Sequence, residues 1–168
     1  MSTTTTRAKQ HQKRWQEIIA DPNLRELPYK VETNQRDQIV LSPHRSDRSY
    51  AQGDVIELLY EHEEEGRPFP KFPITTEAGV RVPDVVWVTS ERREEMDETG
   101  DPPTLAPEVC IEVMSENNDW DEMHNKRALY LEAGAEEVWV LTEEGAVRFF
   151  ADKEIEASGV LPEFPEHV

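Results

Sequence analysis

Residues 107–141 of the chain read PEVCIEVMSENNDWDEMHNKRALYLEAGAEEVWVL, and this stretch decides the fold. Its first and last apolar segments, 108–114 and 137–141, are typical of buried strands. Residues 121–133 between them have helical spacing and end at Gly134, a residue type favoured just after helix C-termini. Two strands joined by a helix need a crossover connection, which places them in a parallel or mixed sheet. We therefore expect an α/β fold with a mixed central β-sheet flanked by helices.

The flanking sequence predicts further elements on both sides of this stretch. Upstream we expect a helix at 7–20, a hairpin with strands at 29–33 and 38–41, and a helix over 44–62 that Ser42 and Pro43 open as N-cap and first residue. Further predictions are a loop at 63–70, strands at 72–75 and 80–88, an acidic loop at 91–103 and a last strand at 147–150.

The length and composition favour one folded domain. The chain has 168 residues, 36% of them hydrophobic and 32% charged, which suits a single core with a polar surface. We expect an N-terminal arm and helix at 1–23, followed by the main domain at 24–168. The apolar runs fall far short of the roughly 20 residues of a membrane span, and the polar N-terminus lacks the apolar segment of a secretory signal. We therefore expect no membrane association and a cytoplasmic location.

The charge is large, negative and unevenly distributed. The formal net charge is −18; residues 1–50 carry 9 Lys and Arg against 6 Asp and Glu, so the remainder carries 9 against 30. Such acidity argues against tight nonspecific adhesion to nucleic acid, which usually depends on a basic surface. A basic arm beside an acidic body could meet a phosphate backbone, but a merely well-solvated surface explains the charge equally well. The single cysteine, Cys110, lies in an apolar strand and is expected to be a packed thiol.

Two carboxylates fall inside apolar strands. Asp84 lies at the start of one predicted strand and Glu112 in the middle of another, both among apolar neighbours. Alternate residues of a strand share a face, and both faces of these strands are apolar, so we expect both carboxylates to be buried. An unpaired buried carboxylate costs several kcal/mol, so each needs a cation, a hydrogen-bond donor or a raised pKa. A hard divalent cation such as Mg²⁺ satisfies both carboxylates at once. The alternatives are that Asp84 caps a turn and that Glu112 forms a buried salt bridge.

A lysine accompanies these carboxylates on the following helix. Lys126 shares one helical stripe with Met123, Leu129, Tyr130 and Ala133, so it lies on the inward face. There its ammonium could orient an attacking water near Glu112 and balance the charge that develops on a phosphate. The alternative is a side chain that covers apolar surface with its stem and reaches solvent with its charged end.

Together these segments resemble the Uma2 family, formerly DUF820, of restriction endonuclease-like proteins. The resemblance is carried by VPDVV at 82–86, by Glu112-Val113-Met114-Ser115, and by Lys126 with the Tyr130, Gly134 and Trp139 positions that follow it. It extends upstream to YKVE at 29–32 and to Ser42-Pro43-His44, and covers residues 24–165.

The resemblance implies a PD-(D/E)xK nuclease core, a Mg²⁺ or Mn²⁺ cofactor and a homodimer. Asp84 and Glu112 take the two acidic positions of the motif, and Met114 stands where the superfamily has its lysine, so Lys126 is the candidate for the displaced role, with Arg127 as an alternative. A main-chain carbonyl near Val113 is expected as a further metal ligand. Glu32 and His44 match positions that the family favours and are possible additional site residues.

Three functions are compatible with these residues. The leading hypothesis is a metal-dependent endonuclease that hydrolyses phosphodiester bonds of nucleic acid, DNA more than RNA. The second is a catalytically silent nuclease-fold module that binds or regulates a protein partner, which the acidic body favours. The third is another metal-dependent hydrolase on the same core, because function belongs to the site rather than to the fold.

Overall fold

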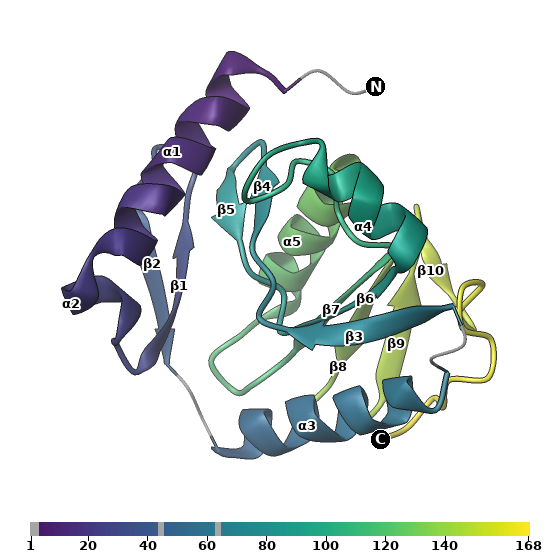
Figure 1. The fold of residues 1–168 in the computed structure, drawn as a ribbon. Helices are drawn as coiled ribbons and strands as arrows, with labels where there is room; N and C mark the ends of the chain where they lie inside the picture. The colour runs from purple at the N-terminus through teal and green to yellow at the C-terminus, as the bar shows by residue number, and fades with distance from the viewer. Residues whose placement is uncertain (1–3, 44–45, 63–64) are drawn as a thin grey trace.

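The computed structural model describes residues 4–43, 46–62 and 65–168 (Figure 1). His44, one of the predicted site residues, lies outside these ranges. Within them, no helix is both long and apolar enough to cross a membrane.

A six-stranded mixed sheet forms the centre of the molecule. Its strand order is β10-β9-β8-β7-β6-β3. The strands are β3 (Gly66–Pro70), β6 (Val85–Thr89), β7 (Val109–Val113), β8 (Glu137–Leu141), β9 (Val147–Phe150) and β10 (Glu154–Ile155). Only the β7–β8 pair is parallel, with Val109 opposite Glu137, and the other neighbours run antiparallel. The predicted mixed sheet is confirmed, and α5 (Trp120–Glu132) is the crossover helix.

The two faces of the sheet are covered by different helices, as Figure 1 shows for α3 (Ser46–Tyr60) and α5. Val85, Trp87 and Ile111 pack with residues of α3 in the larger apolar cluster. Val86 and Cys110 point to the other face, where they pack with Tyr130 of α5. The alternation predicted along β6 and β7 is therefore confirmed, and Glu112 faces the α5 side because it shares the parity of Cys110.

The N-terminal part forms a helix and hairpin unit beside the sheet. It comprises α1 (Thr6–Ala20), α2 (Pro22–Arg25), β1 (Tyr29–Thr33) and β2 (Ile39–Pro43), and it meets the small hairpin of β4 (Ile74–Thr76) and β5 (Gly79–Arg81). Trp15 and Ile18 of α1 pack against Val80 and Val82. Gly79 has φ +90°, and a Cβ there would lie 2.3 Å from the carbonyl oxygen of Asn34, so only glycine allows the two hairpins to approach this closely.

Three sequence predictions about local structure were wrong. Ser42 and Pro43 do not open a helix but end β2, where Pro43 pairs with Tyr29 at the edge of a two-stranded ribbon. The loop predicted at 63–70 contains β3, an edge strand, and edges tolerate proline because the missing N–H faces away from the ladder. The acidic loop at 91–103 begins within α4 (Ser90–Asp97), which Thr89 caps by accepting the Arg92 N–H at 3.1 Å.

The strand predicted at 80–88 is divided by residues 82–84 into β5 and β6, which belong to different sheets, and the other predicted elements are confirmed to within a few residues. Gly134 has φ +106° directly after α5, the left-handed conformation expected after a helix C-terminus. Cys110 is fully buried, as predicted for a packed thiol.

Candidate active site

Asp84, the residue just before β6, lies opposite Glu112 of the neighbouring strand β7. Val85 of β6 pairs with Ile111 of β7 in antiparallel register, and one further step places Asp84 opposite Glu112. Both side chains are buried, with 1% and 2% of their surface exposed. The register of the sheet thus brings together two carboxylates that are far apart in the sequence.

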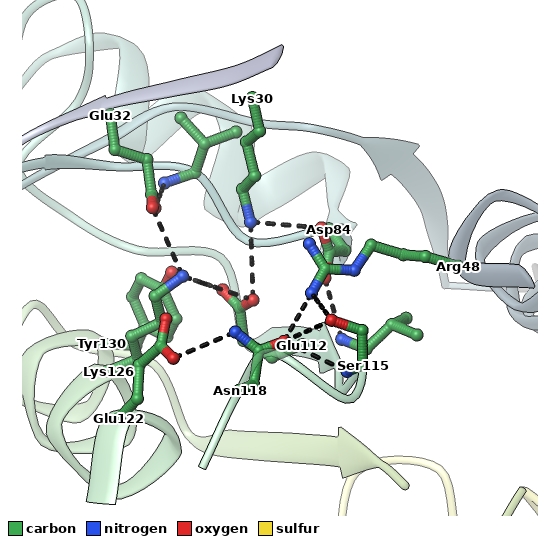
Figure 2. Close-up of polar contacts among 12 residues, drawn as sticks. Lys30, Glu32, Arg48, Asp84, Glu112, Ser115, Asn118, Glu122, Lys126 and Tyr130 are labelled. Carbon is green, nitrogen blue, oxygen red and sulfur yellow. Dashed lines mark hydrogen bonds and ion pairs between the residues drawn. The ribbon is translucent and has the colours of Figure 1, made fainter. Parts of the chain in front are cut away.

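Lys30 of β1 bridges the two carboxylates (Figure 2). Its Nζ lies 3.1 Å from Asp84 Oδ1 and 3.5 Å from Glu112 Oε2. The lysine itself is only 5% exposed, so these contacts are shielded from water. A single cation therefore already faces one oxygen of each carboxylate.

A third carboxylate and a second lysine complete the buried cluster. Lys126 Nζ of α5 lies 3.3 Å from Glu32 Oε1 and 3.6 Å from Glu112 Oε2. Glu32 accepts a hydrogen bond at 2.7 Å from the Val82 N–H. The predicted inward position of Lys126 near Glu112 is confirmed, and the solvent-reaching alternative is wrong because the side chain is 6% exposed.

Neutral donors hold the remaining carboxylate oxygens. The Tyr130 hydroxyl donates to Glu112 Oε1 at 2.7 Å, and the Val113 N–H donates to Asp84 Oδ2 at 2.8 Å. Asp84 therefore does not cap a turn, since its donor lies on the adjacent strand. Val113 contributes its N–H to the cluster, while the role of a carbonyl near it as a metal ligand stays a prediction.

Arg48 of α3 contacts the loop that follows β7. Its Nη2 donates to Ser115 Oγ at 2.9 Å and also to Asn118 Oδ1, and Asn118 Nδ2 donates to Glu122 Oε2 at 2.9 Å. Arg48 Nε is buried without a hydrogen-bond partner among the described residues. Figure 2 shows the arginine reaching toward the Asp84 side of the cluster.

Burial and charge act in opposite directions on the pKa values of this cluster. Burial alone would raise the pKa of Asp84 and of Glu32, but the lysines and the main-chain donors outweigh it and both pKa values are lowered. Burial, together with Asp84 and Glu32, raises the pKa of Glu112 despite the two lysines. Burial alone would lower the pKa of Lys30, but Glu112, Asp84 and Glu32 raise it. Lys30 is therefore charged at neutral pH and acts as the counter-ion of the carboxylates.

The donor set suits a hard cation that keeps some of its own water. Among residues 4–43, 46–62 and 65–168, no group of three or more His, Cys, Asp or Glu side chains could hold a metal ion. Asp84 and Glu112 nevertheless present one oxygen each to a common cation, Lys30 Nζ. Mg²⁺ is commonly held by one or two carboxylates plus water and substrate phosphate. The two carboxylates fit such an ion, provided that the Lys30 ammonium moves out of its position between them.

The sequence prediction captured part of this cluster. Asp84, Glu112, Lys126 and Glu32 were expected and come together, and the buried salt bridge considered for Glu112 is present. Arg127, the alternative to Lys126, instead lies 4.9 Å from the centre of the Phe150 ring, over the sheet.

Three residues of the cluster and its rim were missed. Lys30 precedes Glu32 by two strand positions and Tyr130 follows Lys126 by four helical positions, so the facing rules already applied to their neighbours indicate both. Arg48 carries no local signal.

Comparison with known proteins places the chain in a family. A crystal structure described as "a putative nuclease belonging to DUF820 from Anabaena variabilis ATCC 29413" matches with a TM-score of 0.57 and 15% sequence identity, over 72% of this chain and 71% of that one. The chain therefore has the mixed α/β fold of that protein. A sequence model of the Uma2 family, described as "Putative restriction endonuclease", matches residues 12–165, and the chain belongs to this family. No curated protein matches the chain.

Proposed function

We propose that the protein is a Mg²⁺- or Mn²⁺-dependent endonuclease that hydrolyses phosphodiester bonds, with DNA as the preferred substrate. The observation that carries the proposal is the buried pair Asp84, just before β6, and Glu112 of β7, with an oxygen of each directed at one cation, Lys30 Nζ. Membership of a family described as "Putative restriction endonuclease" supports the same reaction class.

Asp84 and Glu112 would hold the divalent cation, with a main-chain carbonyl near Val113 as a further ligand. A divalent cation there would supply a Lewis acid for the phosphoryl oxygen and for the attacking water. The Val113 N–H and the Tyr130 hydroxyl each hold one oxygen of these carboxylates and so direct the other oxygen toward the ion.

The two lysines have separate tasks in this proposal. Lys126 lies between Glu112 and Glu32, where it can orient the attacking water and balance charge on the phosphate. Glu32 fixes the lysine in that position and is itself held by the Val82 N–H. Lys30 is the counter-ion that a divalent cation held by Asp84 and Glu112 would take the place of.

The test combines metal binding with cleavage. Purified protein is incubated with single- and double-stranded DNA and RNA in Mg²⁺ or Mn²⁺, and Asp84→Ala and Glu112→Ala serve as site variants. We expect both variants to lose metal binding in calorimetry and to lose cleavage by several orders of magnitude, as on removal of essential metal ligands. Wild-type protein that binds metal only as well as Asp84→Ala contradicts the assignment.

A second candidate, a catalytically silent binding module, is favoured by one observation. Each of the three carboxylates of the cluster already contacts Lys30 or Lys126 within the described residues, which favours a fold that buries them without a metal ion. Absence of both metal binding and cleavage in wild-type protein would support this candidate.

The assembly and location of the protein are further parts of the proposal. A homodimer follows from the family resemblance, and sedimentation of the purified protein tests it. A cytoplasmic location is consistent with the described residues lacking a helix that could span a membrane, and cell fractionation tests it.

A further inference from the structure

A cavity of about 230 Å³ adjoins the buried cluster on the side of the N-terminal unit. Its wall is formed in part by the aromatic rings of Trp15 and Tyr29. Trp15 is 8% exposed and packs in the core, whereas Tyr29 is 43% exposed. The cavity therefore has an apolar wall with one accessible aromatic ring.

The charge of this cavity is opposite to that of the protein. Its lining includes Arg25, Lys30 and Lys71, and none of its described lining residues is Asp or Glu. The chain as a whole has a formal net charge of −18. Lys30 is paired with Asp84 and Glu112, but Arg25 and Lys71 give this otherwise uncharged lining a local positive charge. Such a lining suits an anionic ligand, because the local potential rather than the net charge decides where anions gather.

The cavity shares its wall with the proposed metal site. Lys30 lines it and directs its ammonium at Asp84 and Glu112. The N–H of Lys71, another lining residue, donates to the Asp84 carbonyl oxygen at 2.9 Å. Val82, also in the wall, donates its N–H to Glu32. A ligand in the cavity would thus lie next to the residues of the proposed metal site.

Lys71 has an unusual backbone for its residue type. Its φ is +47°, in the left-handed region that favours glycine and asparagine. A lysine side chain gains nothing from this conformation, and strained positions of this kind cluster at functional sites. This backbone conformation makes Lys71 a candidate functional residue of the cavity.

We propose that this cavity binds a nucleotide unit of the substrate strand adjacent to the scissile phosphodiester. The aromatic wall packs against the base, and Arg25 and Lys71 contact the phosphate. Aromatic rings beside cations are the usual means of holding single-stranded nucleic acid without sequence readout. The inference rests on the proposed nuclease function and adds a substrate subsite to it.

The test measures binding without cleavage. Full-length protein in EDTA at low salt is titrated against a short fluorescein-labelled single-stranded oligodeoxynucleotide, and fluorescence anisotropy reports the affinity. Arg25→Ala and Lys71→Gly remove the cations, and Tyr29→Ala removes the exposed ring. The matched control is Lys153→Ala, which removes the same charge from the exposed turn before β10. We expect each subsite variant to bind about 5- to 10-fold more weakly, as for loss of one stacking or phosphate contact, and the control to stay within about twofold.

Two further readouts separate the subsite from a folding effect. Lys71→Gly suits φ +47°, so its thermal midpoint should not fall even though its affinity does. The affinity for an oligonucleotide that is abasic throughout should change little in Tyr29→Ala, because there is no base to pack against the ring. Arg25→Ala should still weaken the binding of this oligonucleotide.

The proposal is overturned if Arg25→Ala and Lys71→Gly bind as tightly as wild type, or if the wild-type protein binds no strand. Wild-type cleavage with unaffected subsite variants would remove the subsite and leave the nuclease function standing. Binding that depends on the subsite residues, without any cleavage by wild-type protein, would contradict the nuclease function and leave the binding site standing.

Discussion

Replacing Lys30 with methionine tests whether its ammonium occupies the position between Asp84 and Glu112 that a divalent cation would take. The substitution keeps much of the chain length but removes the ammonium that lies 3.1 Å from Asp84 and 3.5 Å from Glu112. Glu112 retains Lys126 at 3.6 Å and the Tyr130 hydroxyl, whereas Asp84 retains only the Val113 N–H among these close partners. A buried carboxylate left without its counter-ion typically costs about 3–5 kcal/mol. We expect the free energy of unfolding to fall by about that amount in chelator.

The assay is urea unfolding of wild-type protein and Lys30→Met, each in EDTA and in excess Mg²⁺. Because the ion no longer competes with the ammonium, the variant should regain stability in Mg²⁺, by about 2.7 kcal/mol at a concentration 100 times the dissociation constant. Wild-type protein should gain less at the same concentration. Lys153→Met controls for the loss of a surface charge.

Two results would refute this reasoning. If Lys30→Met in EDTA is as stable as wild type, the ammonium does not compensate the buried carboxylates. If Mg²⁺ stabilises the variant no more than it stabilises wild type, Lys30 does not occupy the place of a divalent cation.

Three other predictions follow from single contacts. Tyr130→Phe leaves Glu112 Oε1 without its donor at 2.7 Å and should destabilise the fold by about 1–3 kcal/mol in urea unfolding; an unchanged midpoint would show that the oxygen finds another donor. Cys110 is fully buried and burial raises the pKa of its thiol, so a thiol-reactive dye at neutral pH should label it only after unfolding, and rapid labelling of native protein would contradict the packing. Gly79→Ala places a Cβ 2.3 Å from a main-chain oxygen at φ +90° and should cost at least about 2 kcal/mol, while Gly53→Ala, with no atom within 4 Å of the added Cβ in a helix, should stabilise by up to about 1 kcal/mol; equal thermal midpoints for the two would argue against the contact between the hairpins.

The sequence by itself determined the central architecture and the partitioning of its side chains. The crossover between β7 and β8 follows from two apolar strands on either side of one helix, and the alternation along β6 and β7 predicts which residues face each helix. Both inferences depend on local periodicity, which neighbouring residues along the chain specify. The edge strand β3 was not predicted, because its prolines indicate a loop as long as its partner strand is unknown.

Some residues of the candidate site could be predicted from local sequence patterns, and others only from the tertiary structure. Asp84, Glu112 and Lys126 stand out in the sequence because charged residues occupy positions with apolar neighbours. Only the tertiary structure decided that Lys30, from a hairpin outside the central sheet, bridges the two carboxylates. Local alternation places Lys30 on the same face of β1 as Glu32. The packing of that hairpin beside the sheet depends on contacts between segments distant in the chain, so no local pattern reveals that Lys30 bridges Asp84 and Glu112.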